Sequence, residues 1–411
     1  MKILVVGAGG REHALAWKIA QSPLCRQLFV APGNGGTEGW NVPIAANDVA
    51  ALTRFAKERR VDLTVIGPEE PLTLGLADAL RAEGLAVFGP GQAAARLEGS
   101  KAFAKEVLAA AGAPTARCRV FTDQAAALAY AEKAAPVVIK ADGLAAGKGV
   151  IVAATAEEAR RAVRDIMGGG FGAAGATVLA EEYLTGPEVS LLCFCDGETA
   201  LPMVAAQDHK RAFDGDKGPN TGGMGVCAPP PVWTPALEAE TLERIIRPVL
   251  AEMRRRGAPF TGTLFAGLML TADGPKALEF NARFGDPETQ ALMLLLESDL
   301  VPLLLACAAG DLSGTRAVWR PGAAVCVVMA APGYPGAYEK NIPLTLPREL
   351  PEDTAIFHAG TAWRDDDALL SAGGRVLGVT ARGGDLAAAR ARAYALTESI
   401  GFPGARYRRD I

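Results

Sequence analysis

Residues 137–152 carry two β-branched runs on either side of a glycine-rich loop, and this pattern limits strongly what the chain can fold into. The runs are Val-Val-Ile at 137–139 and Val-Ile-Val at 150–152, and together they predict a β-hairpin. The loop and its borders hold three glycines and two lysines: Gly143, Gly147, Gly149, Lys140 and Lys148. Glycine leaves backbone N–H groups free to surround an anion, and lysine adds positive charge. We interpret the loop as a flexible lid over nucleotide phosphates; the alternative is an ordinary tight hairpin with surface lysines.

The P-loop of kinases and GTPases is the obvious competing interpretation, and the spacing excludes it. A P-loop has four residues between its glycines, a Ser or Thr after its lysine, and then a helix. Here three residues separate Gly143 from Gly147, Gly149 follows Lys148, and residues 150–153 resemble a strand. The loop therefore belongs to a hairpin and not to a strand–loop–helix unit.

The composition indicates a multidomain protein without an obvious nucleic-acid or membrane surface. For 411 residues we expect two to four domains. The formal net charge of −4 argues against general nucleic-acid binding, and no apolar run is long enough to span a bilayer. The seven cysteines are scattered without a Cys-x-x-Cys pair, and no secretory signal is visible. We therefore expect reduced thiols and a cytoplasmic location.

The first hundred residues alternate strands with helices. We expect strands at 3–6, 29–30, 63–66 and 86–88, and helices at 12–21, 49–59 and 75–82. Strands that are each followed by a helix predict a parallel α/β sheet, which binds ligands beyond the carboxyl ends of its strands. The candidate loops at that edge are 7–11, 31–36, 67–70 and 89–90.

A Rossmann dinucleotide site is a tempting interpretation of Gly7 and Gly9, but its fingerprint is incomplete. The fingerprint requires a glycine where this chain has Glu12, and an acidic residue after the second strand, which is missing. A phosphate at the N-terminus of the first helix is the better hypothesis, because Gly9, Gly10 and Arg11 supply donors there.

Further units follow this first one. We expect helices at 123–134 and 156–167, strands at 177–181 and 188–195, and a final α/β unit with strands near 354–358 and 375–380 and a helix at 386–398. Residues 207–225 are polar, glycine-rich and long for a loop, and such loops are commonly functional or disordered. Asp286 is expected to cap a helix whose first residue is Pro287.

Residues 279–283 (Glu-Phe-Asn-Ala-Arg) end a strand and suggest a metal site. Because alternate residues of a strand share a face, Glu279, Asn281 and Arg283 point together. Two oxygen ligands suit magnesium that bridges nucleotide phosphates, and Arg283 is placed to hold a developing phosphate. The alternative is a plain ion pair between Glu279 and Arg283.

Two weaker patterns complete the survey. Residues 181–188 bend at a Gly-Pro pair after a strand, where an acidic side chain can bind ribose and the backbone can pair with adenine. On the pattern alone, a plain acidic turn is favoured. Three scattered histidines predict no histidine metal site: we expect packing roles for His13 and His358 and substrate positioning for His209.

In combination these segments resemble the ATP-grasp superfamily and, more closely and from end to end, its phosphoribosylamine–glycine ligase family. The resemblance rests on residues 7–17, 31–34, 97–103, 139–150, 207–211, 218–225, 279–290 and 357–361. It implies an α/β (α+β multidomain) ATP-grasp fold with a parallel α/β domain before it and a C-terminal α/β domain. The implied boundaries are 1–101, 102–322 and 323–411, with a lid subdomain at about 122–188.

The resemblance also implies a reaction. The carboxylate of glycine attacks the γ-phosphate of ATP to give glycyl phosphate, and the amine of 5-phosphoribosylamine then displaces phosphate and forms an amide, in purine synthesis. Phosphoryl transfer is mostly positioning and charge neutralisation, so the absence of an obvious nucleophile in the sequence is no obstacle. The implied cofactors are ATP and magnesium or manganese. The implied partners are the small-molecule substrates, without nucleic acid or membrane, for a monomeric cytoplasmic enzyme.

The family pattern assigns roles to individual residues. ATP is assigned to Lys105, Lys140, Gly143, Gly147, Lys148, Gly149, Glu181, Tyr183, Leu184 and Glu188, and magnesium to Glu279 and Asn281. The catalytic residues are Arg283, Lys140 and Asp208, and the substrates are assigned to Gly9, Gly10, Arg11, Asn34, Lys210, Thr221 and Asp286. Many ATP-grasp relatives add an acidic metal ligand on the preceding strand, but residues 264–270 contain none, which leaves a third protein ligand in doubt.

Two other functions remain open on the sequence. One is a nucleotide-binding regulatory protein that kept the fold and lost the chemistry, although the presence of Glu279, Asn281 and the loop lysines speaks against it. The other is an ATP-grasp ligase or carboxylase that acts on another amine or acid.

Overall fold

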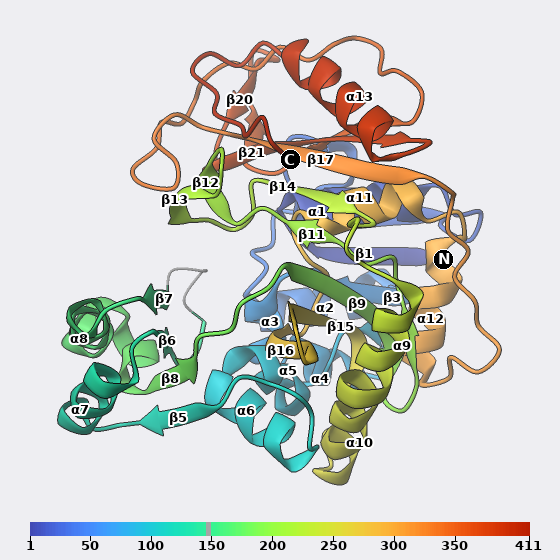
Figure 1. Ribbon diagram of the computed structural model, residues 1–411. Coiled ribbons are helices and arrows are strands. Elements are labelled where there is room, and N and C mark those ends of the chain that lie inside the picture. Colours follow the sequence, from blue (N-terminus) through green and yellow to red (C-terminus); the bar gives the residue numbers. More distant parts are fainter. Residues whose placement is uncertain (145–148) are drawn as a thin grey trace.

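The computed structural model describes residues 1–144 and 149–411. Figure 1 shows sheets and helices packed into one body, and a smaller sheet with α7 (Gln124–Ala134) and α8 (Ala156–Asp165) that projects from it as a lid. Within these residue ranges, no helix is long and apolar enough to cross a membrane.

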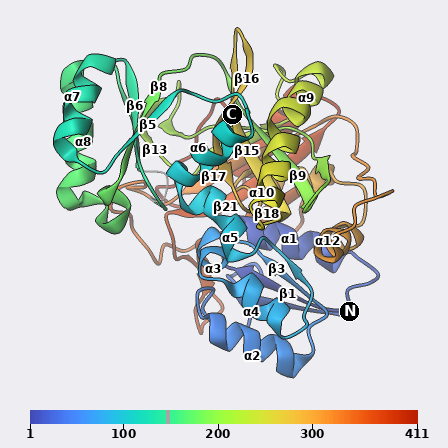
Figure 2. The ribbon, with the colours of Figure 1, turned by 90° about the horizontal axis from the view of Figure 1, so that it is seen from below.

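The N-terminal residues form a parallel sheet in the order β2-β1-β3-β4, as the alternating pattern predicted. Alternate residues of a strand face opposite sides: Ile3 and Val5 pack with the first helix, whereas Leu4 and Val6 pack with α2 and α4. Figure 2 shows α2 on the outer surface of this sheet. The elements are β1 (Lys2–Gly7), α1 (Gly10–Ala20), β2 (Gln27–Pro32), η1 (Glu38–Trp40), α2 (Val49–Arg59), β3 (Leu63–Ile66), α3 (Glu69–Thr73), α4 (Leu76–Ala82) and β4 (Val87–Phe88).

The lid is an antiparallel sheet in the order β5-β8-β6-β7. Its two helices cover one face, where Val137, Ile139 and Val178 belong to a separate small core. Strand β6 pairs with β7 from Val137 opposite Ala153 to Lys140 opposite Val150, which confirms the predicted hairpin. The remaining elements are β5 (Cys118–Phe121), β6 (Val137–Ala141), β7 (Val150–Ala153), η2 (Ile166–Gly170), η3 (Gly172–Ala176) and β8 (Val178–Glu182).

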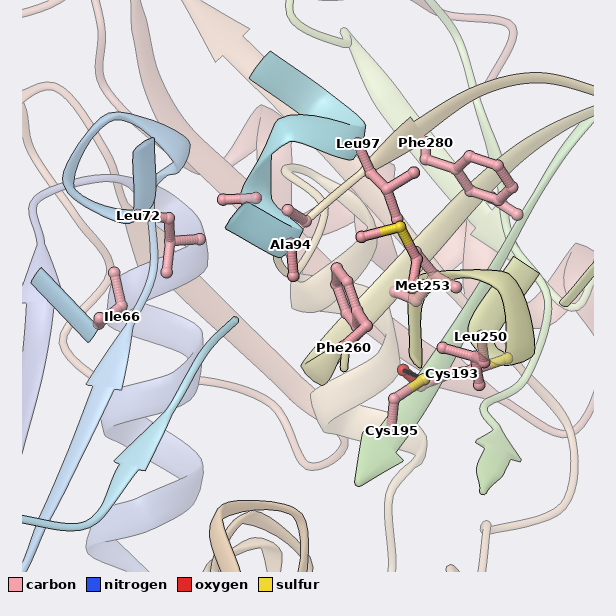
Figure 3. Close-up of a cluster of buried hydrophobic side chains, with 14 of the residues drawn as sticks. Ile66, Leu72, Ala94, Leu97, Cys193, Cys195, Leu250, Met253, Phe260 and Phe280 are labelled. Atoms are coloured by element: carbon pink, nitrogen blue, oxygen red, sulfur yellow. Dashed lines mark hydrogen bonds between the residues drawn. The ribbon is translucent and has the colours of Figure 1, made fainter. Parts of the chain in front are cut away.

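A second antiparallel sheet, in the order β10-β9-β15-β16, forms the middle of the body. Figure 3 shows its core, in which Cys193 and Phe280 from the sheet lie with Leu97, Met253 and other side chains from the helices. Because Phe280 is buried there, its neighbours Glu279 and Asn281 lie on the opposite face of their strand. The elements are α5 (Gln92–Gly99), α6 (Lys101–Ala110), β9 (Glu188–Asp196), β10 (Ala200–Pro202), α9 (Pro235–Thr241), η4 (Leu242–Ile246), α10 (Arg247–Arg255), β15 (Thr261–Thr271) and β16 (Gly274–Asn281).

The third large sheet, in the order β11-β14-β17-β21-β18, combines the C-terminal strands with two strands from the polar segment 207–225 and its surroundings. This segment is therefore not a structureless loop, because β14 pairs along β17 from Gly225 to Ala228. The elements are β11 (Gln207–Asp208), β12 (Arg211–Phe213), β13 (Lys217–Asn220), β14 (Gly225–Ala228), α11 (Glu288–Leu295), α12 (Leu300–Ala309), β17 (Ala323–Ala330), β18 (Thr354–His358), β19 (Thr361–Trp363), β20 (Leu369–Ser371), β21 (Arg375–Gly383) and α13 (Leu386–Glu398).

Two local expectations were wrong. Helix α3 begins at Glu69, inside a segment expected to be a loop. The helix after Asp286 begins at Glu288, and Pro287 takes the capping position without a side-chain hydrogen bond. The reason is that the Asp286 carboxylate is used elsewhere: its Oδ1 accepts a hydrogen bond from Gln290 Nε2 at 2.8 Å.

Candidate functional site

A buried carboxylate between two lysines lies at the end of the candidate site where the sequence predicted a nucleotide; we call this region the nucleotide end. Glu181 on β8 accepts from Lys105 Nζ of α6 at 3.1 Å and from Lys140 Nζ of β6 at 2.9 Å, both at Oε2. The three side chains are no more than 9% exposed. Burial lowers the pKa of Lys105, and the attraction of Glu181 opposes that shift only in part. The structure thus brings together three residues that the sequence placed in the ATP site.

An apolar cluster lies beside this triad. It consists of Ala116, Leu184 and Met269, with Leu278 packed against it. The other oxygen of Glu181, Oε1, is buried and has no hydrogen-bond partner among the described residues, while Tyr183 is 44% exposed. A flat apolar ring with an N–H at its edge matches this combination, because its face can lie against the cluster while the N–H satisfies the unpaired oxygen.

The glycine loop is anchored to the body at its N-terminal end, at residues 142 and 143. Lys101 Nζ donates to the carbonyl of Gly143 at 2.9 Å, and the Asp142 carboxylate accepts from Ala102 N at 3.1 Å. Gly143 has φ +98°, a conformation that favours glycine. At the far end Gly149 is buried and its carbonyl accepts from Ala141 N at 2.8 Å. Gly147 and Lys148, which the sequence assigned to ATP, lie outside the described residues.

Glu279 and Asn281 lie on the open face of β16. In the pairing of β15 with β16, Glu279 stands opposite Gly267, so the preceding strand offers no carboxylate at this register. Among the described residues no cluster of three or more His, Cys, Asp or Glu side chains could hold a metal. A metal site at this position would have only two protein ligands, one carboxylate oxygen and one amide oxygen. Magnesium binds with so few protein ligands when nucleotide phosphates supply others.

Arg283 is held by two carboxylates from the neighbouring units. Its Nη2 donates to Glu98 Oε1 at 2.7 Å, and its Nε donates to Glu69 Oε2 at 3.2 Å. A third bond, from Nη2 to Asn281 Oδ1 at 3.2 Å, connects the guanidinium to the amide of this neighbouring residue on β16. Burial alone would lower the pKa of Arg283, but Glu98 and Glu69 outweigh it and raise the pKa. The ion pairs of Arg283 are thus with α3 and α5, and not with Glu279 as the plain ion-pair alternative proposed.

Lys210 connects the polar segment to this face. Its Nζ lies 2.7 Å from Glu188 Oε2 and 4.0 Å from Glu279 Oε1. Burial raises the pKa of Asp208; Lys210 opposes this shift, and the like charges of Glu188 and Glu279 add to it. Burial, followed by Asp208, also raises the pKa of Glu288 to about 7. One ammonium therefore lies near a group of carboxylates, of which Glu288 can carry a proton at neutral pH.

The substrate end lies between the first helix and the C-terminal sheet. A Cβ placed on Gly9 would lie 3.2 Å from Asp286 Oδ2, so the glycine turn and this carboxylate are adjacent. Arg375 of β21 lies 3.5 Å from Asp286 Oδ2 and donates to the Asp286 carbonyl at 2.7 Å. Burial would raise the pKa of Asp286, but Arg375, Arg11 and the hydrogen bond from Gln290 together outweigh it, and the pKa lies below its usual range.

Several assigned substrate residues are already occupied by protein partners. Asn34 Nδ2 donates to the carbonyls of Ala8 and His358, at 2.9 and 2.7 Å. Arg11 is buried and donates to Glu12 and to the Phe284 carbonyl. The side chains of Asn34 and Arg11 therefore support the glycine turn. At Gly10 any larger residue would clash with the Gln290 amide, because a Cβ there would lie 2.6 Å from it.

Thr221 closes the polar segment on the same side. Its Oγ1 donates to the Lys210 carbonyl at 2.9 Å and accepts from Gly223 N at 3.0 Å. Arg375 also reaches this turn, because its Nη1 donates to the Gly222 carbonyl at 2.6 Å. The structure therefore brings Thr221, Lys210 and Asp286 into one region.

Two of the histidines form a contact between the first helix and β18. The His358 backbone N–H donates to His13 Nδ1 at 2.8 Å. Burial, with a smaller contribution from His358, lowers the pKa of His13 to about 3, and burial lowers that of His358 to about 4. Both imidazoles are neutral at physiological pH, in agreement with packing roles.

Sequence reasoning missed Arg375, Glu98 and Glu69. Arg375 stands directly before four apolar residues, 376–379, of the same strand, which is a usable signal for a charge that is partly buried. Glu98 lies in a helix of small residues and is only 9% exposed. Nothing local distinguishes Glu69, because its partner Arg283 is distant in the sequence.

Comparisons with known proteins agree with one another. Family models match three consecutive parts: the phosphoribosylglycinamide synthetase N domain at residues 1–98, its ATP-grasp (A) domain at 99–289 and its C domain at 324–411. The phosphoribosylamine–glycine ligases of Agrobacterium fabrum and Salmonella typhimurium are each 53% identical to the chain, over 100% of it and 98% of the relative.

Solved structures extend the likeness to the fold. The phosphoribosylamine–glycine ligase of Thermotoga maritima gives a TM-score of 0.88 at 35% identity, over 100% of both chains. The biotin carboxylase domain of Hydrogenobacter thermophilus 2-oxoglutarate carboxylase, solved with magnesium ADP and bicarbonate, gives 0.75 at 17% identity, over 99% of this chain and 91% of that one. At that identity the likeness shows the fold alone.

Proposed function

The chain belongs to the phosphoribosylglycinamide synthetase family, and from this premise we propose which of its residues carry out the family's reaction. The reaction is the ATP-dependent ligation of glycine to 5-phospho-D-ribosylamine through glycyl phosphate, in the biosynthesis of IMP. It gives 5-phosphoribosylglycinamide, ADP and phosphate. The full-length likeness to the curated ligases carries this conclusion.

ATP binds where the lid meets the central sheet. The adenine ring occupies the apolar cluster of Ala116, Leu184 and Met269, and its amino group donates to the unpaired Glu181 Oε1. Lys105 and Lys140 lie beside the ring and extend toward the phosphates. The glycine loop, including Gly147 and Lys148, covers the phosphates from the lid side, and the ribose lies near Glu188.

Magnesium fits the open face of β16. Glu279 and Asn281 would hold it, since both present oxygen atoms on the face that is turned away from the core. When bound, magnesium neutralises charge on the transferred phosphoryl group. Manganese would be accepted by the same oxygen ligands.

Glycine is activated beside Arg283 and Lys210. Carboxylate oxygen is a poor leaving group, and phosphorylation turns it into a good one. Lys140 and Arg283 hold the phosphoryl group in line with the attacking oxygen, because both cations are fixed by buried carboxylates. Asp208 then accepts the proton that the amine of phosphoribosylamine loses when the C–N bond forms and phosphate departs. Its raised pKa suits a proton acceptor.

Phosphoribosylamine binds at the substrate end. The lack of a side chain at Gly9 and Gly10 lets Asp286 and Gln290 pack against the turn, and Asp286 and Thr221 border the space proposed for the ligand. Arg375 fixes Asp286 and the turn at Gly222 relative to one another.

We further propose a monomeric cytoplasmic enzyme with domain boundaries at 101/102 and 322/323 and a lid at about 122–188. The free thiols support a reducing compartment, because all seven cysteines are unpaired.

Phosphate release from ATP tests the reaction. Purified protein is supplied with magnesium, glycine and freshly generated phosphoribosylamine, and each component is omitted in turn. We expect release that requires all of them. Release that persists without glycine would refute the assignment, and a requirement for a different acid or amine would favour another ATP-grasp ligase.

The metal assignment has its own variant. Glu279→Ala should lower kcat by more than about 100-fold, because loss of even an indirect support of a bound metal costs about 10- to 100-fold. The matched control is Glu240→Ala. It removes a partly exposed carboxylate of α9 that forms an ion pair with Arg244 of η4. Substantial magnesium-dependent activity in a folded Glu279→Ala protein would overturn the metal site.

A further inference from the structure

A two-stranded ribbon, β12 with β13, lies between Lys210 and Thr221. It pairs Arg211 with Asn220 and Phe213 with Lys217, and residues 213–219 between and beside these pairs are exposed. An isolated two-stranded hairpin is marginally stable in water, so its conformation depends on what it contacts. The ribbon is contacted by residues 408–410, close to the C-terminus.

Arg408 is the principal contact. This side chain is 1% exposed, and its Nη1 donates to Asp216 Oδ1 at 2.7 Å and to the Arg211 carbonyl at 3.2 Å. The other edge of the guanidinium forms two parallel bonds with Asp410, at 2.7 Å each. A planar, permanently charged fork is suited to this double role, because it joins the ribbon to its own segment.

The residues after Arg408 reinforce the contact. Arg409 N donates to Asp214 Oδ1 at 2.8 Å, and Asp410 Oδ2 accepts from Gly215 N at 2.8 Å. Ile411 is buried, and a Cβ on Gly225 would lie 2.7 Å from its Cδ1. Residues 408–411 therefore hold the tip of the ribbon and pack beneath β14, to which the ribbon leads.

The ribbon transmits this constraint to the substrate region. The carbonyl that Arg408 binds belongs to Arg211, the residue directly after Lys210. At the base of the ribbon, Thr221 N donates to the Lys210 carbonyl at 2.8 Å. A shift of the ribbon would therefore move the Lys210 ammonium relative to Glu188, Asp208 and Glu279.

We propose that Arg408 is a positioning residue for ligation: it holds the ribbon so that Lys210 and Thr221 meet the substrates. The inference rests on the proposed substrate roles of these two residues. Lys210 and Thr221 are assigned to the acceptor substrates, whereas the nucleotide is reached only through the pair of Lys210 with Glu188 beside the ribose. Loss of Arg408 should therefore affect the acceptor substrates far more than adenine nucleotide binding.

Arg408→Ala and Arg408→Lys test the proposal, with Arg409→Ala as the matched control. The Arg409 side chain stacks over Tyr407 and only its backbone contacts the ribbon. The measurements are hydrogen exchange of residues 207–225, kcat/KM for glycine and for phosphoribosylamine, and the Kd of ADP. For Arg408→Ala we expect faster exchange in the ribbon, a fall of about 100-fold in kcat/KM and a much smaller change in the Kd of ADP, because small misplacements of catalytic groups have effects of about that size on the rate. The kcat/KM of Arg408→Lys should lie between the values of the wild-type protein and Arg408→Ala, since lysine keeps the positive charge and loses the two parallel hydrogen bonds of the guanidinium.

Other outcomes would overturn the proposal. Unchanged exchange in the ribbon of Arg408→Ala would show that Arg408 does not hold it, and an equal loss of ADP affinity would indicate general damage. A faster-exchanging ribbon with unchanged kcat/KM would refute the positioning role. Lys210→Ala tests the proposed function separately. If Lys210→Ala leaves kcat/KM unchanged, the substrate role proposed for Lys210 is wrong. Hydrogen exchange of the ribbon in Arg408→Ala still decides whether Arg408 holds the ribbon.

Discussion

His13 makes the stability of the protein depend on pH in a way that can be calculated. Its imidazole is 9% exposed, and its Nδ1 accepts the His358 N–H. A Cβ on Gly36 would lie 2.3 Å from His13 Cε1, so this side chain also packs against the loop that contains Asn34. The perturbation is His13→Gln, which keeps an acceptor for the N–H and removes the titrating group.

The magnitude follows from proton linkage. The pKa of His13 is about 3 in the folded protein and 6.5 in the unfolded chain. The folded state therefore binds fewer protons, and the contribution of His13 to stability is complete above the unfolded pKa and is lost as the pH falls from 6.5 toward 3. At about pH 5 the unfolded state gains a factor of about 30 from protonation, which is about 2 kcal/mol. The pKa of His358 is about 4 in the folded protein, so His358 also contributes stability that is lost as the pH falls.

Urea unfolding at about pH 7.5 and about pH 5 measures the effect. The free energy of unfolding is extrapolated to water for both proteins at both pH values. Between these pH values the wild-type protein should lose about 2 kcal/mol more than His13→Gln. Comparing the two proteins cancels the contributions of carboxylates that titrate in both.

An equal pH dependence in the two proteins would refute the reasoning, because it would mean that His13 is protonated alike in the folded and unfolded states. A greater loss in His13→Gln would refute its sign.

Two further predictions concern the site. Glu181→Gln should lower the free energy of unfolding by about 3–5 kcal/mol in urea titrations, because it leaves the ammonium groups of Lys105 and Lys140 buried without a counter-charge. The neighbouring Glu182→Gln, which disturbs only an exposed ion pair, should cost no more than about 1 kcal/mol, and equal costs would contradict the triad. Arg375→Ala should raise KM for phosphoribosylamine about 10-fold in steady-state assays, since it breaks a partly buried charge pair with Asp286 and a loss of about 1.4 kcal/mol is tenfold in affinity. The Kd of ADP should stay unchanged; a lower ADP affinity would show that the substitution damages the nucleotide end instead.

Much of the architecture could be predicted because it depends on short-range rules. Strand and helix periodicity placed the parallel N-terminal sheet and the hairpin of β6 and β7. Alternation along β16 placed Glu279 and Asn281 together and Phe280 in the core. The predicted cap at Asp286 failed because the side chain of Gln290, four residues later, and Arg375 of β21 take the same carboxylate.

The partners of the buried charges could not be predicted in the same way. The sequence offered Glu279 as an alternative ion-pair partner of Arg283, yet Arg283 pairs with Glu98 and Glu69 from other elements. A buried charge requires a counter-charge, but the sequence does not say which one, because the choice depends on how separate sheets pack.

The sequence by itself determined the kind of chemistry in this protein: glycine loops for phosphates, oxygen ligands for a divalent cation, and the family to which these belong. Those features are local, since backbone sterics and the alternation of side chains set them within a few residues. Only the tertiary structure decided that Glu181 lies between Lys105 and Lys140, and that Arg408 holds the ribbon beside Lys210. These contacts join residues that are distant in the sequence, and they form because desolvated charges take the partners that the packed sheets bring within reach.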